Sequence, residues 1–234
     1  MVSLVMMTTG LPQATDLFCS WSGGKDICLA VHRSYDIGGR LRAGLTMLDE
    51  TGERSRSHGL PRSLLEAQAE AMGIDLVFRS ATWGDYTDAF VDGLEELNAR
   101  GLTTGVFGDI DIESHRQWVV DACERAGVTP MHPIWQEDRR ALVDEGIARG
   151  IRSRIVVVNT NHLPESFLGR ELDAETVEAI VAAGADACGE NGEYHSLVTD
   201  APLMTHPLAV DVQNTIRIEG YAFHQLAFAA DRSV

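Results

Sequence analysis

A short stretch near the start of the chain brings together a hydroxyl, two glycines, an ammonium group and a carboxylate. Its residues are Ser22, Gly23, Gly24, Lys25 and Asp26, and they directly follow the apolar residues 17–19. Paired glycines let a backbone turn tightly and bring several amide groups close to a polyphosphate. Lys25, the only lysine in a chain with 19 basic residues, would add a compact full charge at the same place. The pattern predicts a strand, a phosphate-binding loop and a helix.

The helix predicted over residues 26–35 would point its N-terminus at the same phosphate, where free amides and the helix dipole favour an anion. Ser20 and Trp21, just before the loop, are further candidates for contact with the nucleotide. The alternative is an ordinary Ser-Gly-Gly turn beside a solvated lysine. We favour phosphate binding because the string lies between a predicted strand and a predicted helix. It is not a Walker loop, since its hydroxyl precedes the glycines.

The five residues from Ser22 to Asp26 resemble the PP-loop of the ATP pyrophosphatases, enzymes that split ATP between the α and β phosphates. That family usually continues with Ser or Thr, whereas Ile27 stands here. The phosphate cradle is therefore left to the backbone, Ser22 and Lys25. The resemblance implies that the nucleotide is ATP.

A second group of ionisable residues begins at Gly108 and Asp109, between a predicted strand and a helix predicted over residues 112–126. Glu113 and Arg116 lie off the apolar stripe of that helix, near its start, where they could face the nucleotide or its co-substrate. Asp109 has two interpretations that the sequence leaves open. It could cap the helix, with Asp111 as the other candidate cap, or it could bind Mg²⁺ together with ATP phosphates.

A third group, residues 188–197, sets polar side chains between glycines ahead of a predicted strand. Glu190, Asn191, Glu193 and His195 could form a substrate-binding loop, because Glu193 and His195 alternate onto one face of an extended segment. A hairpin turn with solvated acids is one alternative. A metal site that adds Cys188 is another, but zinc prefers more sulfur and nitrogen ligands at tighter spacing.

Strand and helix patterns alternate along the first half of the chain. Strands are predicted at 41–48, 74–78 and 104–107, and helices at 62–72 and 86–97. Such alternation is typical of an α/β fold with a doubly wound parallel sheet, whose ligands bind at the carboxyl ends of the strands. His58 precedes the helix at 62–72 on that side of the sheet and is a further substrate-binding candidate, although a lone loop histidine is often incidental.

Two prolines, at positions 130 and 133, end this alternation and predict an extended connector. We therefore divide the chain into a loose tail at 1–15, an ATP-binding domain at 16–130 and a smaller α+β substrate domain at 131–234. Helices at 140–148 and 174–183, a buried strand at 155–158 and a hairpin within 215–228, turning at 219–220, are predicted for the last part.

Composition restricts the partners of the chain. Its 234 residues carry a net charge of −16, which disfavours direct binding to nucleic acid or to an anionic membrane. The four cysteines form no Cys-x-x-Cys pair and indicate reduced core thiols of a cytoplasmic protein. Residues 1–15 lack the pattern of a signal peptide, and no apolar run is long enough to cross a bilayer.

Six blocks, taken in chain order, resemble the diphthine-ammonia ligase family of PP-loop ATP-binding proteins. They are residues 22–26, 108–110, 113–118, 133–135, 168–170 and 189–195, and the likeness extends over about residues 17–203. The resemblance implies that the PP-loop and Asp109 serve ATP and Mg²⁺, and that Glu190, Asn191, Glu193 and His195 serve the substrate. Asn191, with the contexts of Trp21 and Trp118, resembles a bacterial branch of the family.

The reaction expected from this resemblance is carboxylate activation, in which ATP adenylates an acid and ammonia or an amine then displaces AMP. Lys25 and Asp109 are the expected catalytic residues. A tRNA thiolase would bring a basic surface and a sulfonucleotide reductase a reactive cysteine near its end, and this chain has neither. The main alternative is a sensor that binds ATP without chemistry. The partners would be the acid and its amine donor, and a homodimer is possible.

Overall fold

The computed structural model describes residues 14–228. The tail predicted at 1–15 lies almost wholly outside this range. Within it, the first half of the chain forms a five-stranded parallel sheet in the order β3-β2-β1-β4-β5. Its strands are β1 (Thr15–Ser20), β2 (Gly39–Leu48), β3 (Asp75–Ser80), β4 (Thr104–Val106) and β5 (Thr129–Met131). The connecting helices are α1 (Lys25–Asp36), α2 (Arg62–Met72), α3 (Tyr86–Ala99) and α4 (Glu113–Ala126).

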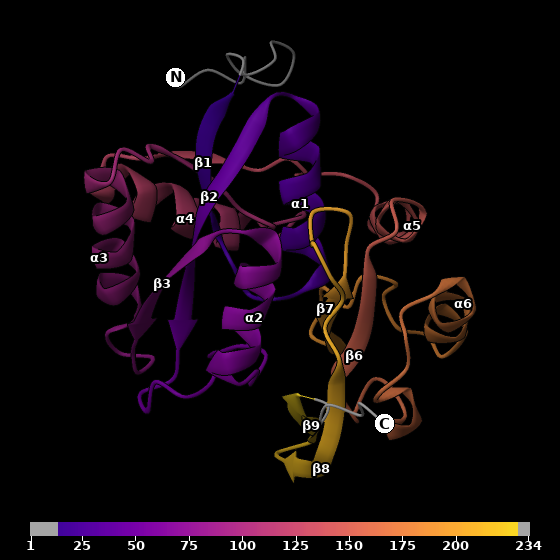
Figure 1. The fold of residues 1–234 in the computed structure, drawn as a ribbon. Coiled ribbons are helices and arrows are strands. Elements are labelled where there is room, and N and C mark those ends of the chain that lie inside the picture. The colour runs from indigo at the N-terminus through magenta and orange to yellow at the C-terminus, as the bar shows by residue number, and fades with distance from the viewer. Residues whose placement is uncertain (1–13, 229–234) are drawn as a thin grey trace, which may run out of the picture.

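Helices cover both faces of this sheet, because its strands are apolar on both sides (Figure 1). In β1, Phe18 belongs to the core under α3 and α4, whereas Leu17 and Cys19 belong to the core on the side of α1 and α2. Such two-sided burial is typical of a doubly wound sheet. The predicted α/β fold is confirmed, and the helix predicted at 62–72 coincides with α2.

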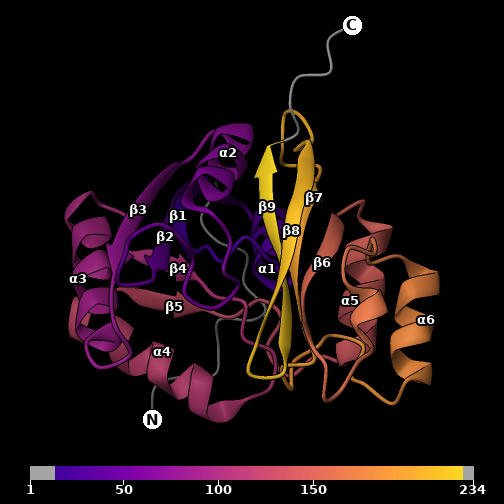
Figure 2. The same ribbon diagram turned by 90° about the horizontal axis from the view of Figure 1, so that it is seen from below.

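The second half of the chain forms a four-stranded antiparallel sheet in the order β7-β6-β9-β8. Its strands are β6 (Arg152–Asn159), β7 (Tyr194–Asp200), β8 (Val210–Ile218) and β9 (Tyr221–Phe228). The helical elements of this half are α5 (Arg139–Ala148), the short 3-10 helix η1 (Glu165–Phe167) and α6 (Ala174–Ala182). Figure 2 shows this sheet between the parallel sheet and helices α5 and α6. The predicted hairpin is present as β8 and β9, turning at Glu219 and Gly220, both with positive φ.

The predicted connector around Pro130 is instead strand β5, at the edge of the parallel sheet. Proline lacks an amide donor, which an edge strand tolerates because one of its sides needs no partner. The division that we proposed at residues 130/131 therefore falls inside this strand.

A buried amide, Gln68 of α2, ties the two sheets together. Its Nε2 donates to the carbonyl oxygens of Gly23 (3.1 Å) and Val198 in β7 (2.7 Å). The amide of Val198 in turn donates to the carbonyl of Gly23 at 2.9 Å. A fully buried side chain that satisfies two backbone carbonyls is costly to lose. Strand β7 of the second sheet is thus bound directly to the loop that follows β1.

Candidate functional site

The loop between β1 and α1 has the backbone geometry expected of a phosphate-binding turn. Gly23 has a φ of +82°, and a Cβ there would lie 2.8 Å from Gln68 Oε1. Gly24 is the N-cap of α1, and a Cβ there would lie 3.1 Å from His58 Nε2. Gly23 is explained by its positive φ and its close surroundings, whereas Gly24 has an ordinary φ of −90° and is restricted by the nearby His58 ring.

This loop lies at the point where the strand order reverses, between β1 and β4. Gly108 follows β4 and packs against the first turn of α1, so close that a Cβ would lie 2.8 Å from the amide nitrogen of Ile27. Ligands of doubly wound sheets bind in the crevice at this reversal, beside a helix N-terminus. The fold therefore places residues 22–26 and 108–109 at one ligand site.

A cleft of about 940 Å³ opens at this point, lined by residues of both sheets. Its volume is within the range of small-molecule sites, which reach about 1,000 Å³. Eleven predicted site residues line it: Ser20, Ser22, Gly24, Lys25, Asp26, His58, Gly108, Asp109, Glu190, Asn191 and His195. Segments far apart in the sequence thus meet in one cleft.

Four further predicted residues do not line the cleft. Trp21 is buried beneath the loop, where its Nε1 donates to Gln68 Oε1 at 3.0 Å. Gly23 faces Gln68 and β7 through its carbonyl. Glu113 and Arg116 pair with each other at 3.1 Å on α4, and the guanidinium of Arg116 lies over the ring of Trp135. The structure gives all four residues supporting contacts instead of positions in the cleft.

Glu193 likewise turns away from the cleft and braces its own loop. The side chain is buried and accepts hydrogen bonds from the amide of Asp186 (3.2 Å) and from the amide and Nδ2 of Asn191 (3.0 and 3.2 Å). Burial opposes ionisation, but these donors lower the pKa of Glu193 overall. The expectation that Glu193 and His195 share one face is not met, because β7 begins only at Tyr194.

Lys25 is a charged group at the N-terminus of α1. Its Nζ donates to both carboxylate oxygens of Asp26, at 3.0 and 2.7 Å, and lies 5.3 Å from the centre of the Tyr194 ring. Burial alone would lower the pKa of Lys25, but the neighbouring Asp26 outweighs it and the pKa is raised. The backbone amide of Lys25 donates to Ser196 Oγ at 3.3 Å.

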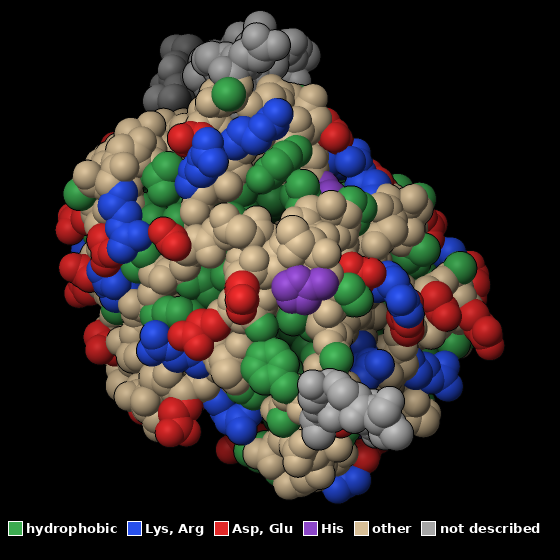
Figure 3. Space-filling model, in the orientation of Figure 1, with side chains coloured by type: hydrophobic (Ala, Val, Ile, Leu, Met, Phe, Trp, Pro, Cys, Tyr) green, Lys and Arg blue, Asp and Glu red, His purple; other side chains and the backbone are tan. Residues whose placement is uncertain are grey.

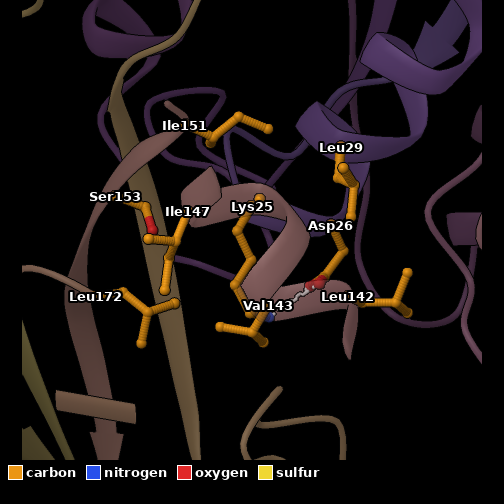
Figure 4. A pocket seen from close by; sticks show the side chains of 10 residues that line it. Lys25, Asp26, Leu29, Leu142, Val143, Ile147, Ile151, Ser153 and Leu172 are labelled. Atoms are coloured by element: carbon orange, nitrogen blue, oxygen red, sulfur yellow. Dashed lines mark hydrogen bonds and ion pairs between the residues drawn. The ribbon is translucent and has the colours of Figure 1, made fainter. Parts of the chain in front are cut away.

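A second, much smaller cavity of about 20 Å³ lies on another side of Lys25 and Asp26. Figure 4 shows the ion pair of these two residues among apolar side chains from α1, α5 and neighbouring segments. The ion pair therefore lies between this cavity and the main cleft. Apolar walls raise the energy of a charge without its partner, which favours the paired arrangement.

The carboxyl group of Glu190 lies in the main cleft and is an unusually weak acid. Burial, with the negative charge of Asp26 next in importance, raises the pKa of Glu190 to about 7, while Lys25 and Arg139 act in the opposite direction. A carboxyl group that titrates near neutral pH can accept or donate a proton under working conditions. Glu190 is therefore the cleft residue best suited to acid-base work.

The structure separates the roles of the two aspartates that follow β4. Neither caps α4, whose N-cap is Ile112 without a side-chain hydrogen bond, so the capping interpretation was wrong. Asp109 lines the cleft, with its Oδ2 3.3 Å from His132 Nε2. Asp111 instead binds Arg139 through both oxygens at 2.7 Å. Arg139 also contacts Asp186 and Asn191, at 2.8 and 3.1 Å, and so holds the loop of Glu190 against the parallel sheet.

One wall of the cleft is aromatic, and its residues were not predicted from the sequence to line a site. It is formed by Trp83, Tyr86 and Phe90 at the start of α3 and by Trp118 of α4. The ring of Trp118 lies 4.8 Å from that of Phe90 and 5.7 Å from that of Tyr86, centre to centre. The apolar periodicity assigns such residues to a core, and only the packing of the two helices shows that they line the cleft.

The surface has no concentration of one charge on the face shown in Figure 3, where acidic and basic side chains are interspersed. Within residues 14–228, no helix is both long and apolar enough to cross a membrane. The same residues contain no cluster of three or more His, Cys, Asp or Glu side chains that could hold a metal.

Comparison with known proteins gives two family models that follow one another along the chain. The diphthamide synthase N-terminal domain matches residues 17–130, and the diphthamide synthase C-terminal domain matches residues 138–227. The chain is similar to proteins named diphthine–ammonia ligase. That of Danio rerio is 26% identical, with 88% of this chain and 91% of the relative covered. Those of Rattus norvegicus and Homo sapiens are 27% and 26% identical, with 88% of this chain and 87% of each relative covered. Both domains are present in their family order, and the chain belongs to the diphthamide synthase family.

Proposed function

We propose that this protein is an ATP-dependent ligase that adenylates a substrate carboxylate and then joins ammonia to it. The observation that carries the proposal is the single cleft in which the phosphate loop of the parallel sheet faces Glu190, Asn191 and His195 of the second half. Nucleotide and acid would thus lie side by side. The relatives whose printed name is diphthine–ammonia ligase support the same reaction class.

The first step would be attack of the carboxylate oxygen on the α phosphorus of ATP. The bond from this phosphorus to the bridging oxygen breaks, and pyrophosphate leaves with the electron pair. Lys25 and the N-terminus of α1 are placed to neutralise the charge that moves onto pyrophosphate. Mg²⁺, held by Asp109 together with phosphate oxygens, would add further charge neutralisation.

In the second step ammonia would attack the acyl carbon, AMP would leave with its electron pair, and one proton would be lost from nitrogen. Glu190 is positioned to receive that proton, because it lies in the cleft with a pKa of about 7. Asn191 lines the same cleft and would contact the acid. The aromatic wall of α3 and α4 would hold the apolar part of a ligand.

The alternative of a sensor that only binds ATP is less favoured. A protein that merely binds the nucleotide needs no carboxyl group of raised pKa beside the phosphate loop. Here Glu190 is such a group, and it lines the cleft. The four cysteines give no support to a thiol mechanism, because all are free and buried, and burial raises their pKa values.

Three narrower proposals go with this function. Asn191, with the contexts of Trp21 and Trp118, supports placement in a bacterial branch, whereas the relatives named above are animal proteins. A cytoplasmic location would suit four cysteines that remain free. A homodimer is also proposed, to be tested by light scattering on the purified protein.

The proposed function is tested by following α-labelled ATP with Mg²⁺, ammonium and fractionated pools of small carboxylic acids. We expect AMP to appear only with a particular pool, and further fractionation would identify the acid. Formation of ADP would contradict attack at the α phosphorus. If ATP binds and stays intact with every pool, the sensor becomes the better description.

A further inference from the structure

Two histidines from different halves of the chain line the cleft and contact each other. His58 comes from the loop between β2 and α2, and His195 from β7, and their ring centres are 4.6 Å apart at an angle of 56°. His58 also lies directly over the phosphate loop, because its Nε2 is 3.1 Å from the position that a Cβ on Gly24 would take. The pair therefore stands at the N-cap of α1, where a phosphate would bind.

Both imidazoles have surroundings that keep them neutral. Burial, assisted by His195 and Lys25, lowers the pKa of His58 well below its usual value. Burial and Lys25 likewise lower the pKa of His195 to about 4, with Asp26 opposing them. The charged groups facing the pair are thus Lys25 and Asp26, both at the start of α1. The Nδ1 atom of His58 is buried and has no hydrogen-bond partner among the described residues.

The ring nitrogen of His58 that lies beside the phosphate loop is Nε2, whereas the unpartnered Nδ1 is enclosed by protein. A neutral imidazole has a single N–H donor, whereas the protonated ring donates from both nitrogens and forms a stronger, charge-assisted hydrogen bond with a phosphate oxygen. The negative charge of a polyphosphate would also favour the protonated imidazole, against the effects of burial and Lys25.

We propose that His58 and His195 form a phosphate clamp, which binds the phosphate chain of the nucleotide from both halves of the protein and takes up a proton when it does so. This inference rests on the proposed function, because it assumes that ATP occupies the cleft. It changes the role predicted for the two histidines from the sequence, which was contact with the acid. Polyphosphate is preferred because His58 lies over Gly24, at the phosphate loop itself.

The test is calorimetry of the full chain with α,β-methylene-ATP, an analogue that cannot release pyrophosphate, at pH 7 in buffers of different ionisation enthalpy. We expect binding to be accompanied by net proton uptake. Inorganic pyrophosphate should cause uptake as well, whereas adenosine should cause none. In His58→Asn and His195→Asn the uptake should fall and the analogue should bind about tenfold more weakly, as expected for loss of a hydrogen bond to a charged group.

His224→Asn is the matched control. His224 also has a buried Nδ1 without a hydrogen-bond partner among the described residues, and burial lowers its pKa too, but it lies on β9 and does not line the cleft. This variant should bind the analogue with unchanged affinity and uptake. Unfolding midpoints of all three variants would identify any loss of the fold, and the NMR titration of the ring protons in the wild-type protein would report the protonation directly.

The possible results distinguish failure of the phosphate clamp from failure of the proposed function. If the analogue binds without proton uptake and both cleft variants bind it normally, the clamp is wrong while ATP binding stands. If the two variants weaken only the acid, the pair belongs to the acid subsite and the clamp is again overturned. If the wild-type protein does not bind the analogue at all, the proposed function itself fails.

Discussion

The two loops that face each other across the cleft use their residues differently. In the phosphate loop, Ser22, Gly24, Lys25 and Asp26 all line the cleft, and only the carbonyl of Gly23 is turned to the protein. In the glycine-rich loop of residues 186–193, the two glutamates of the motif separate. Glu190 lines the cleft, whereas Glu193 accepts three hydrogen bonds from its own loop.

The difference follows from what supports each loop. The phosphate loop is fixed from outside, by Gln68 and by β7, so its own side chains are left for the ligand. The glycine-rich loop is held partly by Arg139 of α5 and partly by its own Glu193. Two glutamates of similar sequence context therefore acquire different roles, one in the site and one beneath it.

The largest effect is expected at Lys25. Removing a preorganised charge from the phosphate loop in Lys25→Ala should cost on the order of 3 kcal/mol at the transition state, about a hundredfold in rate. AMP formation with the identified acid measures it. Lys25→Arg keeps the charge but changes its shape, and should recover only part of the rate. A folded Lys25→Ala protein with normal turnover would refute this role.

Glu193→Gln should give the next largest effect, and on stability instead of chemistry. The new amide would direct N–H groups at backbone donors that now bind a carboxylate, so we expect a loss of about 2 kcal/mol in the free energy of unfolding. Urea unfolding at pH 7 measures it. Because the donors lower the pKa of Glu193, the difference from the wild type should persist at neutral pH and shrink as the carboxylate is protonated in acid. Equal stabilities at pH 7 would contradict the bracing role.

Glu190→Gln should produce the opposite pH dependence. Its pKa is about 7 in the folded protein against an ordinary 4.5, so the folded state binds more protons between these values and loses stability as pH rises through them. The variant lacks this loss. It should therefore match the wild type near pH 4 and be more stable at pH 8, by on the order of 1 kcal/mol once solvent screening is allowed for.

The control for this comparison is Glu124→Gln, which changes an exposed carboxylate of α4 outside the cleft. The difference in stability between this variant and the wild type should be the same at pH 4 and at pH 8. In activity assays Glu190→Gln should also lose an inflection near pH 7 in the profile of kcat/KM. A stability difference between Glu190→Gln and the wild type that does not change from pH 4 to pH 8 would break the contrast between the two glutamates.

Local patterns predicted most of the helices and strands, because their apolar periodicities agree with what the fold buries. The exceptions depend on partners that are distant in the chain. Strand β5 has three residues around Pro130 and exists because β4 offers an edge for pairing. The inward turn of Glu193 depends on the positive φ of Gly189 and Gly192, which reverse the loop before β7 begins.

The same limit applies to the site. Candidate residues that belong to short motifs, such as Lys25 and Asp109, were found because the motif itself suggests the chemistry, and both line the cleft. Tyr86 and Trp118 were missed because they are brought together only when α3 and α4 pack, and either residue alone reads as part of a helix core.

The smallest effect is expected at Arg139. It tests whether the glycine-rich loop depends on the parallel sheet for its position. Its guanidinium bridges Asp111 after β4 and Asp186 and Asn191 in the glycine-rich loop. Lysine cannot bind Asp111 through two nitrogens, so Arg139→Lys should loosen the loop at a cost below about 1 kcal/mol in stability. Because we propose that Asn191 contacts the acid, the KM for the acid should rise several-fold while the affinity for α,β-methylene-ATP stays unchanged. Arg140→Lys is the control, since Arg140 pairs with Asp144 and Glu178 on the surface. If both variants behave alike, the glycine-rich loop is held by its internal hydrogen bonds without help from the parallel sheet, and the two loops are more independent than their contacts imply.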